Sequence, residues 1–373
     1  QLGEFLSGTA AGVNGTDGTD SVQGLSAQLN NLFSAFQSLA ASPTSASARL
    51  NLVSQAQSLA GTFNQITTRL NAVQANLNTC IGDDVDSANK LISDIATLNG
   101  QIASAEASTN STANDLRDMR EQKLEDLAKL VNFQAGSNTN GTIDISIGGT
   151  SIVSGSTVVD TLQTYDAGGG QLKIQTATGG APLTLTGGSI EGAIETRDGA
   201  LADLAGGINS IASTLISQVN SIYTGGYSLT GSTGADFFTG TDAATIGVNS
   251  TLQTDPSLVQ AASVAGASGD NGVALALAQL AAQPNAALGN KTFSDAYGQV
   301  VAQMGNALSN SNDQMANQQA VAGMLANQRD SVSGVSMEEE MTNLVTFQRA
   351  YQASAQIMTT VNQMLETLVS IKS

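Results

Sequence analysis

The sequence of 373 residues contains no histidine, no tryptophan and a single cysteine, and only 4% of its residues are aromatic. Histidine is the commonest general acid–base group and metal ligand, so its absence disfavours both kinds of site. Few aromatic residues disfavour a deep binding pocket lined with rings. One cysteine, Cys80, excludes an intrachain disulfide. Because Cys80 falls on an apolar helical seam, we predict that it is a small buried side chain and not a nucleophile.

Positive charge is also scarce, with 13 Lys and Arg against 31 Asp and Glu and a net charge of −18. An acidic chain repels phosphate backbones, so we expect no nucleic-acid partner. No apolar run approaches the ~18 residues that a transmembrane helix needs, and we expect no membrane insertion. The first residues lack Met and the basic and apolar regions of a signal peptide. We therefore expect the chain to begin inside a longer protein.

Motifs that carry chemistry are missing as well, since the sequence has no GxxxxGK[ST], GxSxG, CxxC or HExxH. Carboxylates between Asp115 and Asp126 alternate with Arg and Lys, which predicts an exposed helix face with weak ion pairs. Near the start, Asn14, Asp17 and Asp20 surround two glycines, but the spacing and closing Glu of a calcium loop are absent. A solvated loop is the better interpretation. We predict no enzyme and no catalytic, cofactor-binding or metal-binding residues.

Hydrophobic periodicity predicts a mainly α fold with an inserted small antiparallel β domain. Apolar residues spaced by three and four predict four antiparallel helices before residue 132, with Gly82 separating the second from the third. From Phe133 the period changes to two, which predicts short strands. We divide the chain into a loop (1–20), three parts of a helical rod domain (21–132, 189–223 and 271–335), a β domain (133–188), an irregular loop region (224–270) and a C-terminal helix (336–373). The expected architecture is an elongated helical bundle plus a long C-terminal helix of coiled-coil type.

The C-terminal stretch from Ser336 to Ile371 is the longest helical pattern and contains no Gly or Pro. Ser336 and Glu339 match a capping box at its start. One face carries an apolar stripe, which we define as Leu344, Phe347, Tyr351, Ile357, Met358, Val361, Met364, Leu365, Leu368 and Ile371. Periodicity alone leaves two interpretations open, an ordinary core helix or a helix whose face is covered by other chains.

Ser333–Lys372, with Gln348–Ala353 at its centre, resembles the C-terminal helix shared by bacterial flagellar rod, hook and hook-associated proteins. Two further segments resemble the flagellar hook-associated protein 1 family, which joins hook to filament. They are the Leu116–Val131 helix that leads into a strand and Phe293–Tyr297 before a Gln/Asn-rich helix. The family's N-terminal helix is missing, and so is an outer domain near 239–270. The resemblance therefore suggests an N-terminally truncated, compact member.

This resemblance implies a structural subunit that self-assembles in a ring, with the terminal helix lining an inner tube and the β domain facing outward. The apolar stripe would then be the assembly and chaperone interface. Implied partners are copies of the chain, the flagellar hook protein, the next hook-associated protein on the filament side and an export chaperone on the C-terminal helix. Implied export runs through the flagellar type III apparatus to the extracellular flagellum. The alternatives are a hook, rod or flagellin-like axial subunit, or a surface adhesin that binds glycans through residues 133–188.

Overall fold

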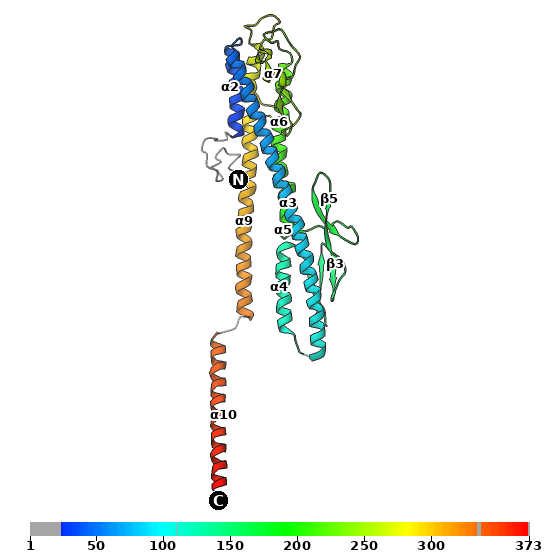
Figure 1. Cartoon of the computed structure of the whole chain (residues 1–373), viewed down its shortest axis with the longest axis vertical. Helices are drawn as coiled ribbons and strands as arrows, with labels where there is room; N and C mark the ends of the chain where they lie inside the picture. Colours follow the sequence, from blue (N-terminus) through cyan, green and yellow to red (C-terminus); the bar gives the residue numbers. More distant parts are fainter. Residues whose placement is uncertain (1–23, 110, 334–336, 372–373) are drawn as a thin grey trace. The chain divides into compact units, whose positions relative to one another are not determined.

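The computed structural model describes residues 24–109, 111–333 and 337–371, and it contains two compact units, Gln1–Gly305 and Asn306–Ser373. In the first unit, helices α2 (Leu25–Ala41) and α3 (Ala46–Thr109) pack together, and α4 (Asn114–Leu130) returns along the second half of α3. Figure 1 shows α3 running along the length of this unit, from α2 and α6 at one end to α4 and the β strands at the other.

Helix α3 differs from the prediction because its 64 residues form one helix and not two. A glycine inside a helix costs about 1 kcal/mol relative to alanine. Next to Gly82, however, Ile81 and Val85 are buried at 0% and 3% exposure. Burying two such side chains contributes several kcal/mol, about 1.5–3 each, so tertiary packing outweighs the weak propensity of the glycine. The region before residue 132 therefore holds α2, α3 and α4 among its described residues.

The inserted β domain is confirmed. Its antiparallel sheet has the order β1 (Gln134–Ser137), β2 (Ile143–Ile147), β3 (Thr150–Ser154) and β4 (Thr157–Val158), and β5 (Leu162–Asp166) pairs with β6 (Leu172–Thr176) as a separate hairpin. Gly148 and Gly149 form the β2–β3 turn with φ of +55° and +81°, a conformation that favours glycine. The alternating pattern also predicts a strand at Leu183–Leu185, and this prediction is wrong, since only Pro182 forms an isolated bridge there, with Gln175.

The helix predicted from Ile190 exists but contains a π-helical turn. It consists of α5 (Ser189–Thr196), the π-helix η1 (Arg197–Leu201) and α6 (Ala202–Tyr223). By length and composition alone, the 35 residues Ser189–Tyr223 could cross a membrane. Ile208, Ile211 and Leu215 nevertheless pack into the same core as α2 and α3, so this is a core helix.

The segment 224–270, which the sequence predicts to be an irregular loop region, contains only short elements and forms an ordered cap on the bundle. The cap extends to residue 292 and contains β7 (Phe238–Thr239), β8 (Gly247–Val248), α7 (Ser250–Thr254), η2 (Pro256–Leu258), α8 (Gly272–Gln279), η3 (Leu280–Ala282) and η4 (Ala286–Leu288). Phe237 anchors it, with ring centroids 5.5 Å from Phe36 and 5.1 Å from Tyr223. Arg49, 1% exposed, donates hydrogen bonds to the carbonyls of Pro43, Ser257 and Val259.

The first unit contains two separate hydrophobic cores. Core 1 joins α2, α3 as far as Leu70, α6 and the cap. Core 2 joins α3 from Ile81 onward, α4, the β domain and the start of α5. Cys80 lies between them and is exposed, so its predicted burial is wrong. The packed face of α3 passes from Leu77, which contacts core 1, to Ile81 of core 2, and Cys80 lies beside this face.

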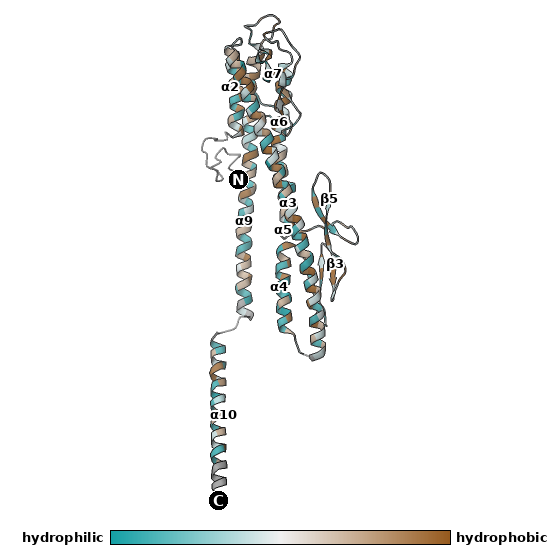
Figure 2. Cartoon of the chain, viewed as in Figure 1, coloured by the Kyte–Doolittle hydropathy of each residue, from teal (hydrophilic) through white to brown (hydrophobic). Residues whose placement is uncertain are grey.

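The second unit contains the end of α9 (Phe293–Ser333) and all of α10 (Met337–Ile371), which confirms two long helices. The start of α9 belongs to the first unit, where Phe293 and Tyr297 are buried in core 1. Figure 2 shows hydrophobic and hydrophilic residues mixed along both helices. The predicted capping box at Ser336 lies outside the described residues, as do Asn14, Asp17 and Asp20.

Candidate assembly surface

The apolar stripe of α10 is exposed wherever its side chains are described. Leu344, Phe347 and Tyr351 are 56%, 75% and 79% exposed, and Ile357, Met358, Val361 and Met364 are exposed too. The side chains of Leu365, Leu368 and Ile371 lie outside the described part of the chain. Contiguous exposed apolar surface is uncommon on monomeric proteins, so this stripe is a candidate interaction surface.

The second half of α9 carries a comparable apolar surface, which the sequence reading did not assign to the interface. Its exposed apolar side chains are Leu308, Met315, Val321, Met324 and Leu325. Leu308, Met315 and Leu325 follow the same spacing of three and four as the stripe of α10. The spacing in the sequence indicates this apolar surface, but the sequence analysis places it in the third part of the rod domain.

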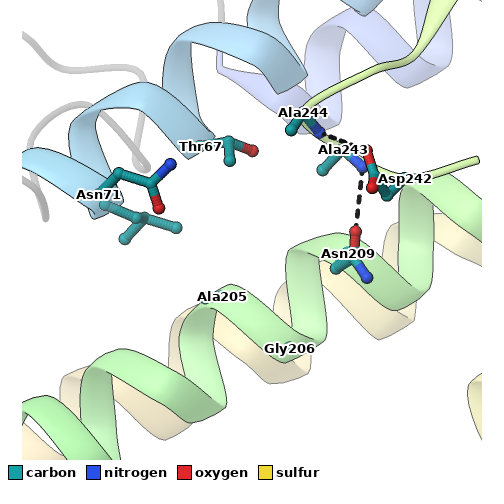
Figure 3. A pocket seen from close by; sticks show the side chains of 9 residues that line it. Thr67, Asn71, Ala205, Gly206, Asn209, Asp242, Ala243 and Ala244 are labelled. Atoms are coloured by element: carbon teal, nitrogen blue, oxygen red, sulfur yellow. Dashed lines mark hydrogen bonds between the residues drawn. The ribbon is translucent and has the colours of Figure 1, made fainter. Parts of the chain in front are cut away.

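A hollow of about 300 Å³ lies between α3, α6 and the turn at residues 242–244 (Figure 3). Its lining residues are Thr67, Leu70, Asn71, Ala205, Gly206, Asn209, Asp242, Ala243 and Ala244. Asp242 is the one ionisable residue among them. Hydrogen bonds from the side chain and backbone of Thr245 lower the pKa of its carboxyl, which keeps it ionised. This carboxylate stabilises its own turn and has no partner for acid–base chemistry in the lining.

A second hollow of similar size, about 290 Å³, lies between the β5–β6 hairpin and α5. Its lining includes Glu191, Lys173 and Tyr165, together with apolar residues of the 182–185 segment. Burial raises the pKa of Glu191, and repulsion from Glu195 and Asp198 adds to the shift. The arrangement lacks the paired carboxylates at a fixed separation that glycoside hydrolysis requires.

The charged face of α4 departs from the prediction at one residue. Lys129 and Asp126 form an exposed ion pair at 2.7 Å, and Lys123 pairs with Asp94 of α3 at 2.9 Å, as expected for solvated charges. Arg120, however, is only 5% exposed. It turns inward and donates to Asn99 and to the Gly141 carbonyl, so part of this face positions the β domain.

Side chains of α3 that the sequence reading missed hold the β domain in place. Asn99 is 0% exposed and hydrogen-bonds both backbone groups of Ile143, and Asn89 does the same to Leu162. No sequence pattern separates these asparagines from the many exposed ones in this chain. Across the described residues, no group of three or more His, Cys, Asp or Glu side chains could hold a metal ion.

Comparison with known families agrees with this architecture. Residues 17–238 match the family described as the flagellar hook-associated protein FlgK helical domain, and residues 326–371 match the C-terminal family of the flagellar basal body rod FlgEFG proteins. The first match spans more than half of the chain.

Individual proteins give the same picture. The chain is 26% identical to flagellar hook-associated protein 1 of Bacillus subtilis, over 93% of this chain and 76% of that protein. It is 24% identical to the Escherichia coli protein of the same name, over 94% and 82%. A stretch of 54 residues is 50% identical to the flagellar hook protein FlgE of Caulobacter vibrioides. The solved flagellar hook junction protein FlgK of Burkholderia pseudomallei shares the fold, with a TM-score of 0.73 at 18% identity, over 84% of this chain and 94% of that one.

Proposed function

Because this chain belongs to the flagellar hook-associated protein FlgK family and is a structural protein of the bacterial flagellum, we propose that it joins hook to filament by assembling through its terminal helix. The observation that carries the proposal is the exposed apolar stripe of α10, with Phe347 and Tyr351 at 75% and 79% exposure. Such a face is an aggregation hazard until another chain covers it. In the assembled junction, neighbouring copies provide that cover.

The second half of α9 extends the same surface, and we include it in the proposal. Its exposed Leu308 and Met324, at 58% and 72%, give the assembly surface a second helix. Burying a large apolar side chain contributes about 1.5–3 kcal/mol. Several such side chains on one face therefore contribute on the same scale as the entropy that association costs, about 4–15 kcal/mol. Head-to-tail contacts of this kind build rings or helices of identical subunits.

The other partners follow from the same stripe and from the family. Before assembly, an export chaperone covers the stripe on α10, including Leu365, Leu368 and Ile371. After export through the flagellar type III apparatus, the hook protein and the next hook-associated protein lie on the two sides of the ring. Residues 326–371 match the C-terminal family of the rod FlgEFG proteins, and this match supports contact between the terminal helix and the hook.

The test is complementation in cells that lack their own junction protein. The full chain should restore filaments, and deletion of residues 336–373 should give hooks without filaments, with filament protein lost to the medium. Phe347→Asp with Tyr351→Asp should give the same loss, because each places a carboxylate in an apolar contact.

The matched control is Gln356→Asp. Gln356 lies nine residues and hence about two and a half turns beyond Phe347, on the opposite face of the same helix. It adds one carboxylate, as each single substitution of the double variant does, and we expect normal filaments. Normal filaments from the Phe347 and Tyr351 double variant, at equal export, would refute assembly through this face.

A further inference from the structure

Between its two cores, the first unit has a layer with almost no buried apolar residue. None of residues 71–80 of α3 is buried, although Val73 and Leu77 pack partly against core 1. The second connection between the cores runs from α5 through η1 into α6. Between Ile190 and Leu201 of this connection, Arg197 is the only buried residue. We call this layer, residues 71–82 and 191–200, the waist, and Ile81 of core 2 is the one buried apolar residue within it.

Two glycines further reduce the side-chain contacts at the waist. Gly82 of α3 and Gly199 of η1 both face open space, since a Cβ added to either would meet nothing within 4 Å. Glycine in a helix also leaves the backbone more conformational freedom than any other residue. The π-helical turn η1 lies at the same level, and such turns are rare and recur at functional sites. Both helical connections are therefore at their weakest at the waist.

Polar contacts around Arg197 hold the waist together. Its Nη1 donates to Asn78 Oδ1 and to the Leu172 carbonyl, both at 2.7 Å, and its Nε donates to Asp198 at 2.7 Å. Asn78 in turn donates to the carbonyl of Gly170 at 2.7 Å. These bonds join α3, η1 and the tip of the β5–β6 hairpin. We call this set the latch.

The latch differs in kind from the two cores. Arg197 is 2% exposed, and its Nη2 has no hydrogen-bond partner within the described structure. A buried donor without a partner lowers the net stability of the contact it belongs to. Hydrogen bonds are directional, whereas the cores are held by apolar packing over many side chains. When the latch opens, little apolar contact remains at the waist to keep the cores aligned, while each core stays packed.

We propose that the waist is a joint between two independently packed bodies, with Arg197, Asn78 and the Leu172 carbonyl as its latch. Opening the latch lets core 2, with the β domain and α4, tilt relative to core 1. The inference rests on the packing of the first unit alone and does not depend on the proposed function.

The joint can be tested with spin labels on the full chain, in a Cys80→Ser background. One label replaces Ser217, exposed on α6 in core 1, and the other replaces Gln163, exposed on β5 in core 2. Double electron–electron resonance then gives the distribution of distances between them. Asn78→Ala removes two bonds of the latch and should raise the population of displaced distances about ten-fold. Arg197→Met, which keeps the bulk and removes the donors, should raise it further.

Filling the glycines should act in the opposite direction. Gly82→Ala and Gly199→Ala have room for the new methyl group and reduce backbone freedom, so the distribution should narrow. The matched controls are Asn51→Ala, at an exposed site on α3, and Gly61→Ala, which also meets nothing within 4 Å but lies inside core 1. Both should leave the distribution unchanged.

A distribution for Asn78→Ala that coincides with that of Asn51→Ala would overturn the joint. A melting curve for each variant separates opening from unfolding, because opening leaves the helical signal intact. If Arg197→Met fails to fold, Asn78→Ala and the glycine pair still decide. Likewise, the proposal would be contradicted if the distance distributions of Gly82→Ala and Gly199→Ala were as wide as that of Gly61→Ala.

Discussion

Asn99 is the residue whose replacement tests most directly how the β domain is attached. Its amide nitrogen donates to the carbonyls of Ile143 and Gly155 at 2.8 and 2.7 Å. Its oxygen accepts from the Ile143 N–H at 3.2 Å and from Arg120 Nη1 at 2.8 Å. The side chain is 0% exposed, so water does not reach it in the native state. One asparagine of α3 thus connects the start of β2, the turn between β3 and β4 and a buried cation.

The cost of Asn99→Ala follows from these four bonds. A neutral hydrogen bond contributes about 0.5–1.5 kcal/mol net, and one from a charged donor about 1.5–3 kcal/mol. Three neutral bonds and one charged bond together give about 3–7 kcal/mol. Arg120 keeps its bond to the Gly141 carbonyl, and water can enter the space that the side chain leaves, so the lower part of that range applies. We expect a loss of about 3–4 kcal/mol in the free energy of unfolding of core 2.

Denaturant unfolding followed by circular dichroism, with hydrogen exchange resolved to residues 143–155, measures this loss. The control is Asn51→Ala on the same helix, where the exposed side chain accepts only a long bond of 3.5 Å from Gln55. Surface changes of that kind stay within about 0.5 kcal/mol. If Asn99→Ala also stayed within that limit, the attachment of the sheet through buried asparagines would be refuted.

Three further predictions concern single groups. Cys80 is exposed and should react with a maleimide in the native protein nearly as fast as in denaturant; strong protection would contradict its position between the cores. The hydrogen bonds from Arg117 and the Ala113 N–H lower the pKa of Glu106 from 4.5 to about 2. The contribution of Glu106 to stability should therefore be complete above pH 4.5 and lost as the pH falls to about 2. In Glu106→Gln, the denaturant midpoint of unfolding should depend less on pH over that window than in the unmodified chain. Tyr223→Phe removes the acceptor of the buried Gln260 N–H and should cost about 1–3 kcal/mol in denaturant unfolding, whereas an unchanged midpoint would show that this bond is dispensable.

The helices that the sequence predicts well are those with a continuous apolar stripe. Pro43 predicts the end of α2, the pattern that begins at Thr292 predicts the start of α9, and the period of two predicts β2 and β3. The errors arise where tertiary packing overrides local preference. Gly82 is a weak helix former, yet α3 continues through it because its neighbours are buried in core 2. The cap at 224–292 has little periodicity, and its order comes from aromatic contacts and Arg49, which join segments distant in the sequence.

The same reasoning explains why the assembly surface was easier to predict than the attachment of the β domain. An apolar stripe is encoded by the identity and spacing of its own residues, so Phe347 and Tyr351 stand out whether or not a partner is present. The role of a buried asparagine depends on the backbone groups it meets, and Asn99 differs from Asn51 only in what lies opposite each on α3. Cys80 shows the converse, since its spacing from Val73 and Leu77 predicts burial, but the packed face of α3 continues at Ile81 and leaves Cys80 exposed. In a chain rich in Asn, Ser and Thr, buried asparagines therefore add directional contacts to the apolar packing of core 2, and only the folded structure distinguishes them from the exposed residues of the same type.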